Sequence, residues 1–375
     1  MKKVILGTAA VLCGAVAFAQ SNESAVDQNG NSNQAVVTQI GGANLSSIDQ
    51  DGGDVGETAN HVATVNQDGL GNSSAIAQTN DDQIAVINQV GLLNSSEVDQ
   101  DGSSNSSTVD QNGVFNASSI TQVGDAGSIE PNNEADVDQI GFFNTAEVSQ
   151  EGTLNDATIL QNGDFNQALI DQIGTENTGD IRQWGSDNAA FQFQDGTGNE
   201  AEIKQGEALT GWESSQYGFG QQEQYGNENE ATIVQRGTDH ESLQFQQGDN
   251  NEVKSYQGND ANFSRQAQVG NDNFANTQQY FTENISYQEQ TGNENHAVTR
   301  QTGGGEGFNF SVQTQFGNNN EVLHAQNGLM NGASTTQRGD MHMSTIKQTG
   351  SNNSATVFQS TVPNVPTPGP GGPTL

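Results

Sequence analysis

Small or apolar residues alternate with polar residues along most of the chain. In the segment 144–150, Asn144, Ala146 and Val148 fall on one face of an extended chain, which continues to Gln150, and the residues between them are polar. This period of two predicts a β-strand, and no apolar stripe with helical spacing competes with it. The preceding residues 140–143 form a short arc with a glycine that suits a tight turn with positive φ.

Strand and arc together form a unit of 11 residues that recurs from about residue 22 to residue 359. The unit reads Q-x-G-x-x-N-x-[AS]-x-[VI]-x and then returns to Gln, as in QIGFFNTAEVSQ over 139–150. One such strand cannot bury its inward face alone, so successive strands are expected to coil and stack. The sequence therefore predicts an all-β fold, a β-solenoid.

The irregular spacings between glutamines favour two strands per coil over three. They follow the third, ninth, seventeenth and twenty-fifth strands, at Gln50→Gln67, Gln122→Gln139, Gln216→Gln224 and Gln301→Gln315. All four strands are odd in number, which would place every irregular arc on one edge of a two-strand coil. Apolar arc residues from Leu70 to Phe165 would line the other edge. We expect about 15 coils, each a 22-residue pair of 11-residue strand–arc units.

The inward amides need partners, because a buried amide without a hydrogen bond costs about 1–3 kcal/mol. In a stack, Asn lies over Asn and Gln over Gln, so each side chain can donate to one neighbouring rung and accept from the other. The inward ladder is expected to contain Asn33, Gln39, Asn94, Gln100, Asn105, Gln111, Asn144, Gln150, Asn155 and Gln161. The turn glycines are expected to include Gly91, Gly102, Gly113, Gly141, Gly152 and Gly163.

A Val or Ile supplies the dry contact of each unit from Val26 to Ile181. Beyond about Gln205 this position changes to residues such as Gln266 and Thr277. The second half of the chain is therefore expected to be less well packed or more variable in register. The basic residues that follow the first strands also lie there, from Arg182 onward.

Composition excludes several classes of protein. The chain has 375 residues, with 10 Lys and Arg against 46 Asp and Glu and a net charge of −36. Such a chain lacks the basic patches that bind nucleic acid or anionic membranes. Only 31% of the residues are hydrophobic, too few for the core of an ordinary two-domain enzyme of this length.

The ends of the chain differ from the repeats. Residues 1–19 combine a Lys-rich start, an apolar stretch and a small-residue cleavage site, as in a secretory signal peptide, and contain the only cysteine, Cys13. No later run of residues is apolar enough to span a membrane. The expected organisation is this signal peptide, a solenoid over 20–361 and a Pro- and Gly-rich disordered tail over 362–375.

The unit resembles the curlin repeat, which builds the major and nucleating subunits of bacterial curli fibres. The family pattern is S-x5-Q-x-G-x-x-N-x-A-x3-Q. Gln139, Gly141, Asn144, Ala146 and Gln150 match its second part, whereas Asn stands in place of the initial Ser. The resemblance covers about residues 22–359 and implies an extracellular functional amyloid of the biofilm matrix, exported unfolded and stacked head to tail. It also implies three partners: further copies of the chain, a nucleator subunit and an outer-membrane secretion apparatus.

No catalytic constellation, P-loop or zinc motif stands out, so no enzyme activity and no cofactor are predicted. His61, His240 and His342 occupy the inward Asn position and are interpreted as substitutes for the amide. Outward residues such as Asp27 and Asp49 directly precede ladder glutamines. They leave specific calcium sites open as an alternative to diffuse screening by cations.

The leading hypothesis is a structural, self-assembling subunit of a secreted, curli-like fibre on the cell surface. The alternatives are a minor or nucleator subunit, or a monomeric β-solenoid that binds ice or a ligand on a flat face. The terminal strands would expose unpaired backbone groups to an incoming copy. The expected assembly edges are Asn22, Val26, Gln28, Asn353, Val357 and Gln359.

Overall fold

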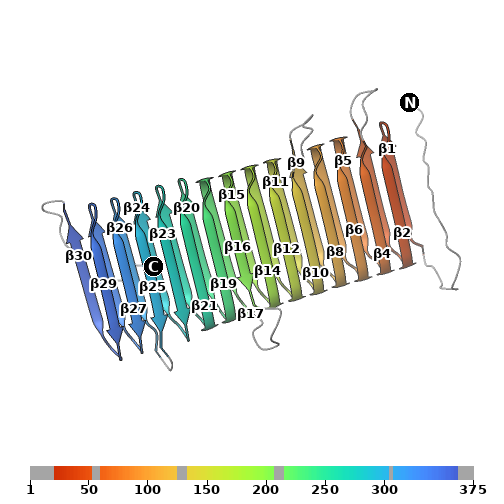
Figure 1. Cartoon of the computed structure of the whole chain (residues 1–375). Coiled ribbons are helices and arrows are strands. Elements are labelled where there is room, and N and C mark those ends of the chain that lie inside the picture. The colour runs from red at the N-terminus through yellow and green to blue at the C-terminus, as the bar shows by residue number, and fades with distance from the viewer. Residues whose placement is uncertain (1–20, 53–59, 125–132, 207–214, 304–306, 362–375) are drawn as a thin grey trace, which may run out of the picture. The chain divides into compact units, whose positions relative to one another are not determined.

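The computed structural model describes residues 21–52, 60–124, 133–206, 215–303 and 307–361. It divides into two compact units, unit 1 up to Gly218 and unit 2 from Phe219 onward. Within the described residues every regular element is a β-strand (Figure 1). The predicted signal peptide with Cys13 and the predicted tail lie outside the described residues.

Unit 1 contains two parallel sheets, 1A and 1B. Sheet 1A has the spatial order β1 (Glu23–Asn29), β3 (Leu45–Asp51), β5 (Ser73–Asp81), β7 (Ser95–Ser103), β9 (Ala117–Val123), β11 (Thr145–Thr153), β13 (Gln167–Thr175) and β15 (Ala189–Thr197). Sheet 1B has the order β2 (Gln34–Gly42), β4 (Val62–Leu70), β6 (Ile84–Leu92), β8 (Ser106–Val114), β10 (Glu134–Phe142), β12 (Asp156–Asp164), β14 (Thr178–Ser186) and β16 (Glu200–Gln205). The two-residue strand β17 (Ser215–Gln216) pairs with β14.

Unit 2 repeats the arrangement with sheets 2A and 2B. Sheet 2A has the order β18 (Phe219–Asn227), β20 (Glu241–Gln247), β22 (Phe263–Val269), β24 (Ile285–Thr291), β26 (Phe310–Phe316), β28 (Gly332–Arg338) and β30 (Ser354–Ser360). Sheet 2B has the order β19 (Glu230–Thr238), β21 (Glu252–Asp260), β23 (Phe274–Tyr280), β25 (His296–Thr302), β27 (Glu321–Asn327) and β29 (Met343–Thr349).

The register confirms the predicted coil. Strands that are neighbours in a sheet are parallel and in phase, so that Gln100 pairs with Gln122 and Gln246 pairs with Gln268, each 22 residues further along the chain. Since the chain passes to the other sheet after each full strand, two strands make one coil. Unit 1 has eight such coils, and unit 2 has six followed by the single strand β30, close to the predicted total of about 15.

The prediction that all irregular arcs share one edge was wrong. Residues 53–59 and 125–132 follow β3 and β9 of sheet 1A, whereas residues 207–214 follow β16 of sheet 1B. Gln216, counted above as the glutamine of the seventeenth strand, is exposed and pairs with Ser186 at the end of β14. β17 therefore continues the line of β16 and does not add a strand to the coil.

The interior of unit 1 follows from the alternation. A column of Val and Ile side chains from Ile48 to Ile203 lies between the sheets, and each is at most 2% exposed. Ala and Ser residues beside this column let the sheets approach closely, as at Ala146 and Ala157. Apolar side chains on one face of each strand are thereby removed from water, which is the driving force for stacking.

Candidate assembly surface

The glutamine that ends each repeat belongs to a continuous ladder. Gln89 Nε2 donates to Gln111 Oε1 at 2.8 Å, and Gln111 Nε2 donates to Gln139 Oε1 at 2.8 Å. Gln111 Nε2 also donates to the backbone oxygen of Ser95, in the strand before it, at 2.9 Å. Each amide thus joins two rungs of one sheet and ties that sheet to the opposite one. The ladder residues Gln100, Gln111, Gln150 and Gln161 are buried, and Gln39 in the first coil is half-buried.

The inward asparagines form a second ladder with the opposite polarity. Asn144 Nδ2 donates to Oδ1 of Asn116 at 3.2 Å and to the backbone oxygen of Gly163 at 2.7 Å. The later residue therefore donates to the earlier one, whereas in the glutamine ladder the earlier residue donates to the later one. The buried residues Asn94, Asn105 and Asn155 follow the same scheme, and Asn33 in the first coil accepts from the backbone N–H of His61.

Unit 2 contains a third ladder that the sequence reasoning missed. At the Val/Ile position of sheet 2A, Gln222, Gln244, Gln266, Gln288 and Gln313 are buried and donate to one another in order, over 2.8–3.0 Å. Each later member also donates to a carbonyl of sheet 2B, as Gln266 does to Lys254 O at 2.9 Å. The expectation of a more variable register in this half was wrong, because the strands of sheet 2A pair in phase and these glutamines satisfy one another. Looser packing of this half stays a prediction. The spacing of 22 residues from Gln222 to Gln288, and of 25 residues from there to Gln313, was the signal that could have revealed the ladder.

The turn glycines cannot carry a side chain. Gly141 has φ 121°, and a Cβ there would lie 2.0 Å from the carbonyl oxygen of Gly163 in the next rung. Gly91, Gly102, Gly113, Gly152 and Gly163 have the same close approach to a glycine carbonyl of the next rung. The arc also contains a second left-handed residue two positions later, which is often bulky, as in Phe143 with φ 56°. Only a stack of identical arcs keeps these backbones so close.

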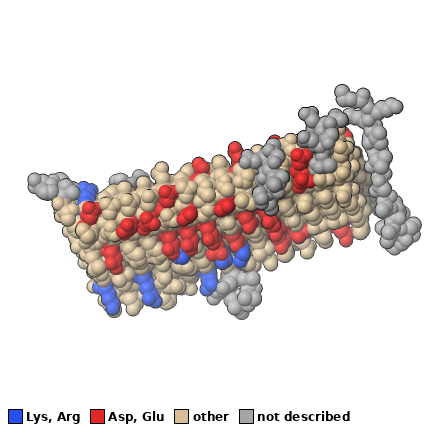
Figure 2. All heavy atoms as spheres, turned by 45° about the horizontal axis from the view of Figure 1, so that its top comes forward, with Lys and Arg blue, Asp and Glu red and all other residues tan. Residues whose placement is uncertain are grey.

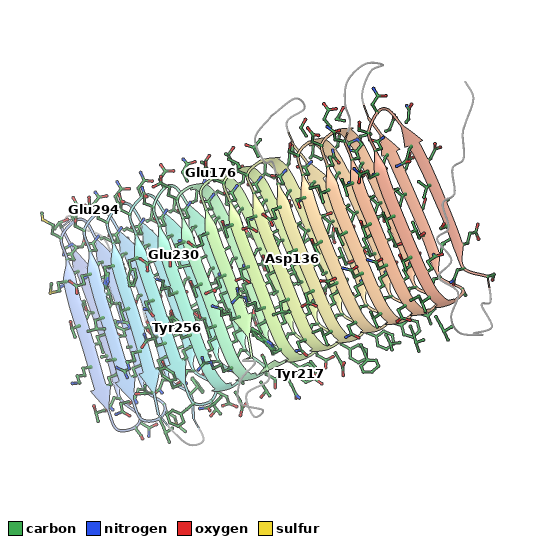
Figure 3. The ribbon with its side chains drawn as sticks, turned by 45° about the vertical axis from the view of Figure 1, so that its right-hand side comes forward. Asp136, Glu176, Tyr217, Glu230, Tyr256 and Glu294 are labelled. Atoms are coloured by element: carbon green, nitrogen blue, oxygen red, sulfur yellow. The ribbon has the colours of Figure 1, made fainter. Side chains whose placement is uncertain are left out.

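The arcs of unit 1 carry an exposed apolar column. The rings of Phe115, Phe143 and Phe165 stack in parallel with centroid distances of 4.9 and 5.1 Å. Leu70 and Leu93 continue the column on the side of β4, and all of these side chains are exposed. Figure 3 shows Tyr217, another exposed arc residue, pointing away from the sheets. The predicted apolar edge is therefore present in unit 1, with stacking between rungs.

The histidines act as amide substitutes at two inward Asn positions. His240 Nδ1 accepts from the backbone N–H of Asn262 at 3.3 Å, and its Nε2 bonds to Arg236 O at 2.9 Å. These are two of the bonds that an asparagine makes at this position, as Asn144 does with Asn166 N and Ile140 O. His61 Nδ1 likewise accepts from the backbone N–H of Gln83. Burial lowers the pKa of both imidazoles, so they remain neutral and can accept.

His324 lies at a Val/Ile position and belongs to a hydroxyl network. Its Nδ1 and Nε2 lie 2.8 Å from Ser311 Oγ and Thr335 Oγ1, respectively. Burial lowers the pKa of His324 to about 3. The protonated ring would therefore be strongly disfavoured in the folded unit.

Outward carboxylates crowd together in unit 1. Burial raises the pKa of Asp136, and the neighbouring charges of Asp110, Glu134 and Asp156 raise it further. Figure 2 shows such acidic side chains lying side by side in rows, with far fewer basic ones among them. Like charges on adjacent rungs repel, so the outward face opposes stacking at neutral pH.

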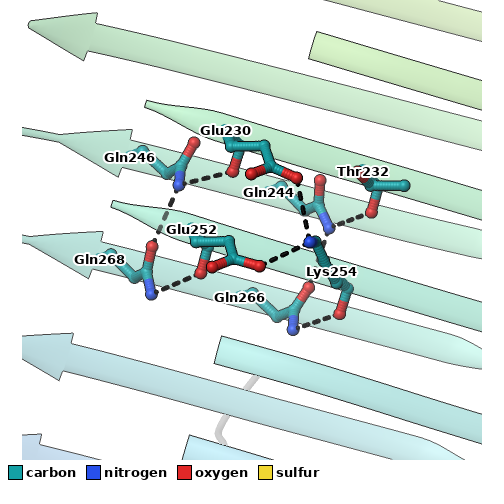
Figure 4. Close-up of polar contacts among 8 residues, drawn as sticks. All are labelled: Glu230, Thr232, Gln244, Gln246, Glu252, Lys254, Gln266 and Gln268. Atoms are coloured by element: carbon teal, nitrogen blue, oxygen red, sulfur yellow. Dashed lines mark hydrogen bonds and ion pairs between the residues drawn. The ribbon is translucent and has the colours of Figure 1, made fainter. Parts of the chain in front are cut away.

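Basic side chains in both units form ion pairs with outward carboxylates. Lys254 on β21 contacts Glu230 Oε1 at 3.0 Å and Glu252 Oε1 at 2.5 Å, so that one ammonium bridges two rungs (Figure 4). Burial opposes its charge, but the hydrogen bonds to Glu252 and Glu230 outweigh that effect and raise the pKa of Lys254. Arg182 pairs with a single carboxylate of its own strand, Asp180.

The terminal strands expose side chains whose counterparts in the inner strands are buried. β1 and β2 have no strand before them and β29 and β30 have none after them within the described residues. Val26, the counterpart of the buried Ile48, is only half-buried, and so is Val357. Asn22 and Asn353 are half-buried and Gln28 is exposed, whereas Gln359 is half-buried. The sequence-predicted edge residues thus lie at the two ends of the described chain.

Ladder polarity makes these two ends different. Gln348 and Gln359 accept from the rung before and donate to backbone oxygens, and no further rung follows to receive their second N–H among the described residues. Gln28 and Gln39 donate to Gln50 and Gln67, and no described residue donates to their Oε1 atoms. One end therefore presents glutamine donors and the other presents glutamine acceptors.

Within the described residues, no three His, Cys, Asp or Glu side chains come together in a group that could hold a metal ion. None of the described segments is a helix with the length and hydropathy needed to cross a membrane.

Fold and ladders define a parallel β-solenoid with in-register amide ladders and open ends. The family model of the curlin associated repeat matches residues 20–52, 131–159, 152–178, 174–206, 226–254 and 331–360. The chain thus contains curlin associated repeats, and these repeats suggest a curli-associated, extracellular role. A comparison with curated proteins found no match.

Proposed function

We propose that this chain is a structural subunit of an extracellular, curli-like amyloid fibre that assembles head to tail and serves the biofilm matrix and cell adhesion. The observation that carries the proposal is the polarity of the open ends, with Nε2 donors at Gln348 and Gln359 and Oε1 acceptors at Gln28 and Gln39. Donors of one copy meet acceptors of the next only when unlike ends face each other. Growth is therefore directional.

The proposal includes the route and the partners of the chain. Residues 1–19 would direct export, after which copies polymerise at the cell surface, aided by a nucleator subunit and an outer-membrane secretion apparatus. The chain has a structural role and no catalytic one. Simple ions screen the outward carboxylates. Sodium should therefore accelerate fibre growth to the same extent as calcium at matched ionic strength. Growth that needs calcium at micromolar concentration would replace this account with specific calcium sites.

The direct test is filament formation by the purified chain from residue 20. We expect unbranched fibres in electron micrographs and a cross-β reflection near 4.8 Å. A chain that stays monomeric by light scattering over days at high concentration would overturn the proposal. It would then favour a monomeric solenoid that binds a surface or a ligand.

Variants of one repeat test whether the ladders drive growth. Asn144→Ala and Gln150→Ala should each slow fibre elongation more than Glu147→Ala, because an inward amide is bonded to the rungs on both sides. Glu147 is exposed and faces outward on the same strand, which makes it the matched control. Equal elongation rates for the three variants would contradict a role of the ladders in assembly.

A further inference from the structure

The two open ends are stepped. In a coil of two strands, each strand lies about 2.4 Å beyond the one before it, half of a rung. The cross-sheet hydrogen bonds follow this order: Gln359 of β30 donates to Met343 O of β29, and Gln39 of β2 donates to Glu23 O of β1. β30 therefore projects beyond β29 at one end, and β1 projects beyond β2 at the other.

We propose that an incoming copy places its β1 on β29 and its β2 on β30, so that the coil continues across the junction. This inference rests on the proposed head-to-tail assembly and states its contact register. If β1 instead lay on β30, the two projecting strands would meet. The recessed strands β2 and β29 would then stand about 9.6 Å apart, two rungs, with their facing backbone groups unpaired.

The hydrogen bonds of Gln28 support the stepped contact. Gln39 donates both to the next rung and to the first carbonyl of the strand before it, and so does Gln50. Gln28 donates to Gln50 and, among the described residues, to no carbonyl of a preceding strand. When β1 lies on β29 of the preceding copy, Gln28 has the same position relative to that copy as Gln359 has within a single copy, where β30 lies on β28. Its second N–H then reaches the backbone oxygen of Ser354, the first residue of β30 in that copy.

Charge distinguishes the two docking modes. With the glutamines in phase, β1 on β29 puts Asp27 beside Lys347, whereas β1 on β30 puts Asp27 beside Phe358. Both Asp27 and Lys347 are exposed on the outward face. Lys347 has no ion pair with any described residue of its own copy. In a chain with a net charge of −36, the stepped contact therefore brings a lysine to a carboxylate at the junction, whereas the other contact brings an aromatic ring to that carboxylate.

The same register continues both amide ladders. Gln348 and Gln359 would donate to Gln28 and Gln39 of the incoming copy. Asn33 of the incoming copy would donate its backbone N–H to Asn353 Oδ1, as Asn353 itself donates to Asn331 Oδ1 at 3.2 Å. The occupant of this end is thus a second copy of the chain.

Disulfide capture between two single-cysteine variants tests the register, since residues 20–375 contain no cysteine. Directly paired residues on neighbouring strands lie about 4.8 Å apart, within the Cα range of a disulfide. Fibres mixed from Asp27→Cys and Lys347→Cys chains should give a covalent dimer on oxidation, as should Thr38→Cys with Phe358→Cys. Asp27→Cys with Phe358→Cys should not.

The outcomes separate this inference from the proposed function. Fibres in which Asp27→Cys links to Phe358→Cys, and not to Lys347→Cys, would overturn the stepped contact and leave the fibre intact. Absence of fibres from the unmodified chain would overturn both.

A charge exchange tests the same contact without cysteines. Lys347→Glu should slow elongation by roughly threefold, because an attraction at the junction becomes a repulsion, and the added change Asp27→Lys should restore it. Arg300→Glu is the matched control, since it makes the same change of charge at an exposed site on β25, away from either end. Equal rates for Lys347→Glu and Arg300→Glu, with no rescue by Asp27→Lys, would contradict the pairing.

Discussion

Units 1 and 2 are built from the same type of coil, but different side chains occupy its interior. The central column of unit 1 is dry from Ile48 to Ile181, whereas sheet 2A of unit 2 has the glutamine ladder from Gln222 to Gln313 at the same position. Contacts between apolar side chains do not require a defined orientation. The amides of a ladder, in contrast, are all hydrogen-bonded only when every rung is in phase. The comparison teaches that the repeat fixes its register by hydrogen bonds where it lacks apolar side chains.

The outward faces differ as well. Between residue 20 and Asp180, the outward face carries carboxylates with no lysine or arginine. Unit 2 places Lys254 between Glu230 and Glu252 and packs aromatic rings such as Tyr287 and Phe310 edge to face, with centroids 6.1 Å apart. Unit 1 therefore carries its repulsion uncompensated over most of its length, whereas unit 2 offsets part of it.

The largest effect should be common to both units, because the arcs are common to both. We expect Gly141→Ala and Gly270→Ala each to destabilise the fold by about 4 kcal/mol or more. A Cβ at either position would lie 2.0 Å from a glycine carbonyl of the next rung. Gly332→Ala is the control, because nothing lies within 4 Å of its Cβ position. Urea denaturation followed by circular dichroism measures the free energy of unfolding of all three variants. A large difference between Gly141→Ala and Gly270→Ala would mean that the two units differ in their arcs as well.

Exchanging the interior residues tests the contrast itself. Ile159→Gln puts a single amide into the dry column, where no rung offers a partner at that position, and should cost about 3 kcal/mol. Gln266→Ile removes the partner of Gln244 and Gln288 and should cost about 2 kcal/mol. Midpoints of urea denaturation give both values. If either exchange were neutral, the two columns would be interchangeable and the distinction between them would fail.

Acid should act on the units in opposite directions. In unit 1, burial and neighbouring carboxylates raise the pKa of Asp136 and Asp138, so the folded unit takes up protons before the unfolded chain does. Its stability should rise as the pH falls through these raised values, although neutral His61 opposes part of the gain. In unit 2, burial lowers the pKa of His324 to about 3, so the unfolded chain binds the proton first and stability is lost as the pH falls from about 6.5 to about 3.

The variant His324→Gln isolates the second effect. The difference in unfolding midpoint between this variant and the unmodified chain should shift in favour of the variant as the pH is lowered from 7 to 4. Parallel pH profiles for the two proteins would show that His324 does not contribute to acid sensitivity.

The smallest effect concerns the ion pairs of unit 2. Lys254→Met should cost about 0.5 kcal/mol at low salt, because the partners Glu230 and Glu252 are partly exposed. The loss should shrink in concentrated sodium chloride, which screens the pair. A loss that is unchanged by salt would mean that packing of the lysine stem, and not its charge, supports the outward face.

Much of this architecture could be read from the repeat. The period of two assigned Ala146 and Val148 to the interior and Glu147 to the outside, as the structure has them. The return of Gln and Asn in phase predicted amide ladders, and the regular recurrence of glycines such as Gly141 and Gly163 predicted tight turns with positive φ, as the structure has them. These features are local or strictly periodic, so one repeat specifies them for all.

Two features of the chain beyond Gln205 were misread. Gln216 fits the spacing after Gln205 but lies on the two-residue strand β17 beside β14, because the backbone pairing of Gly185 and Ser186 decides its place. Gln266 and Thr277 were interpreted as a loss of core packing. Whether a polar residue at an inward position stabilises or destabilises the fold depends on its hydrogen-bond partner, which the sequence does not show. Thr277 Oγ1 donates to Gln288 Oε1 at 3.1 Å, a contact between opposite sheets.

The sequence by itself determined the strand, the arc, the two faces and the 22-residue rung, because each depends on alternation or on spacing along the chain. Only the tertiary structure decided which inward polar residues are satisfied, which strand each irregular arc follows and how the two ends are stepped. Those properties depend on which residues of different rungs and opposite sheets meet in space. A hydrogen bond from Gln266 to Lys254 O, or the order of β29 and β30 at an open end, exists only after the coil has closed.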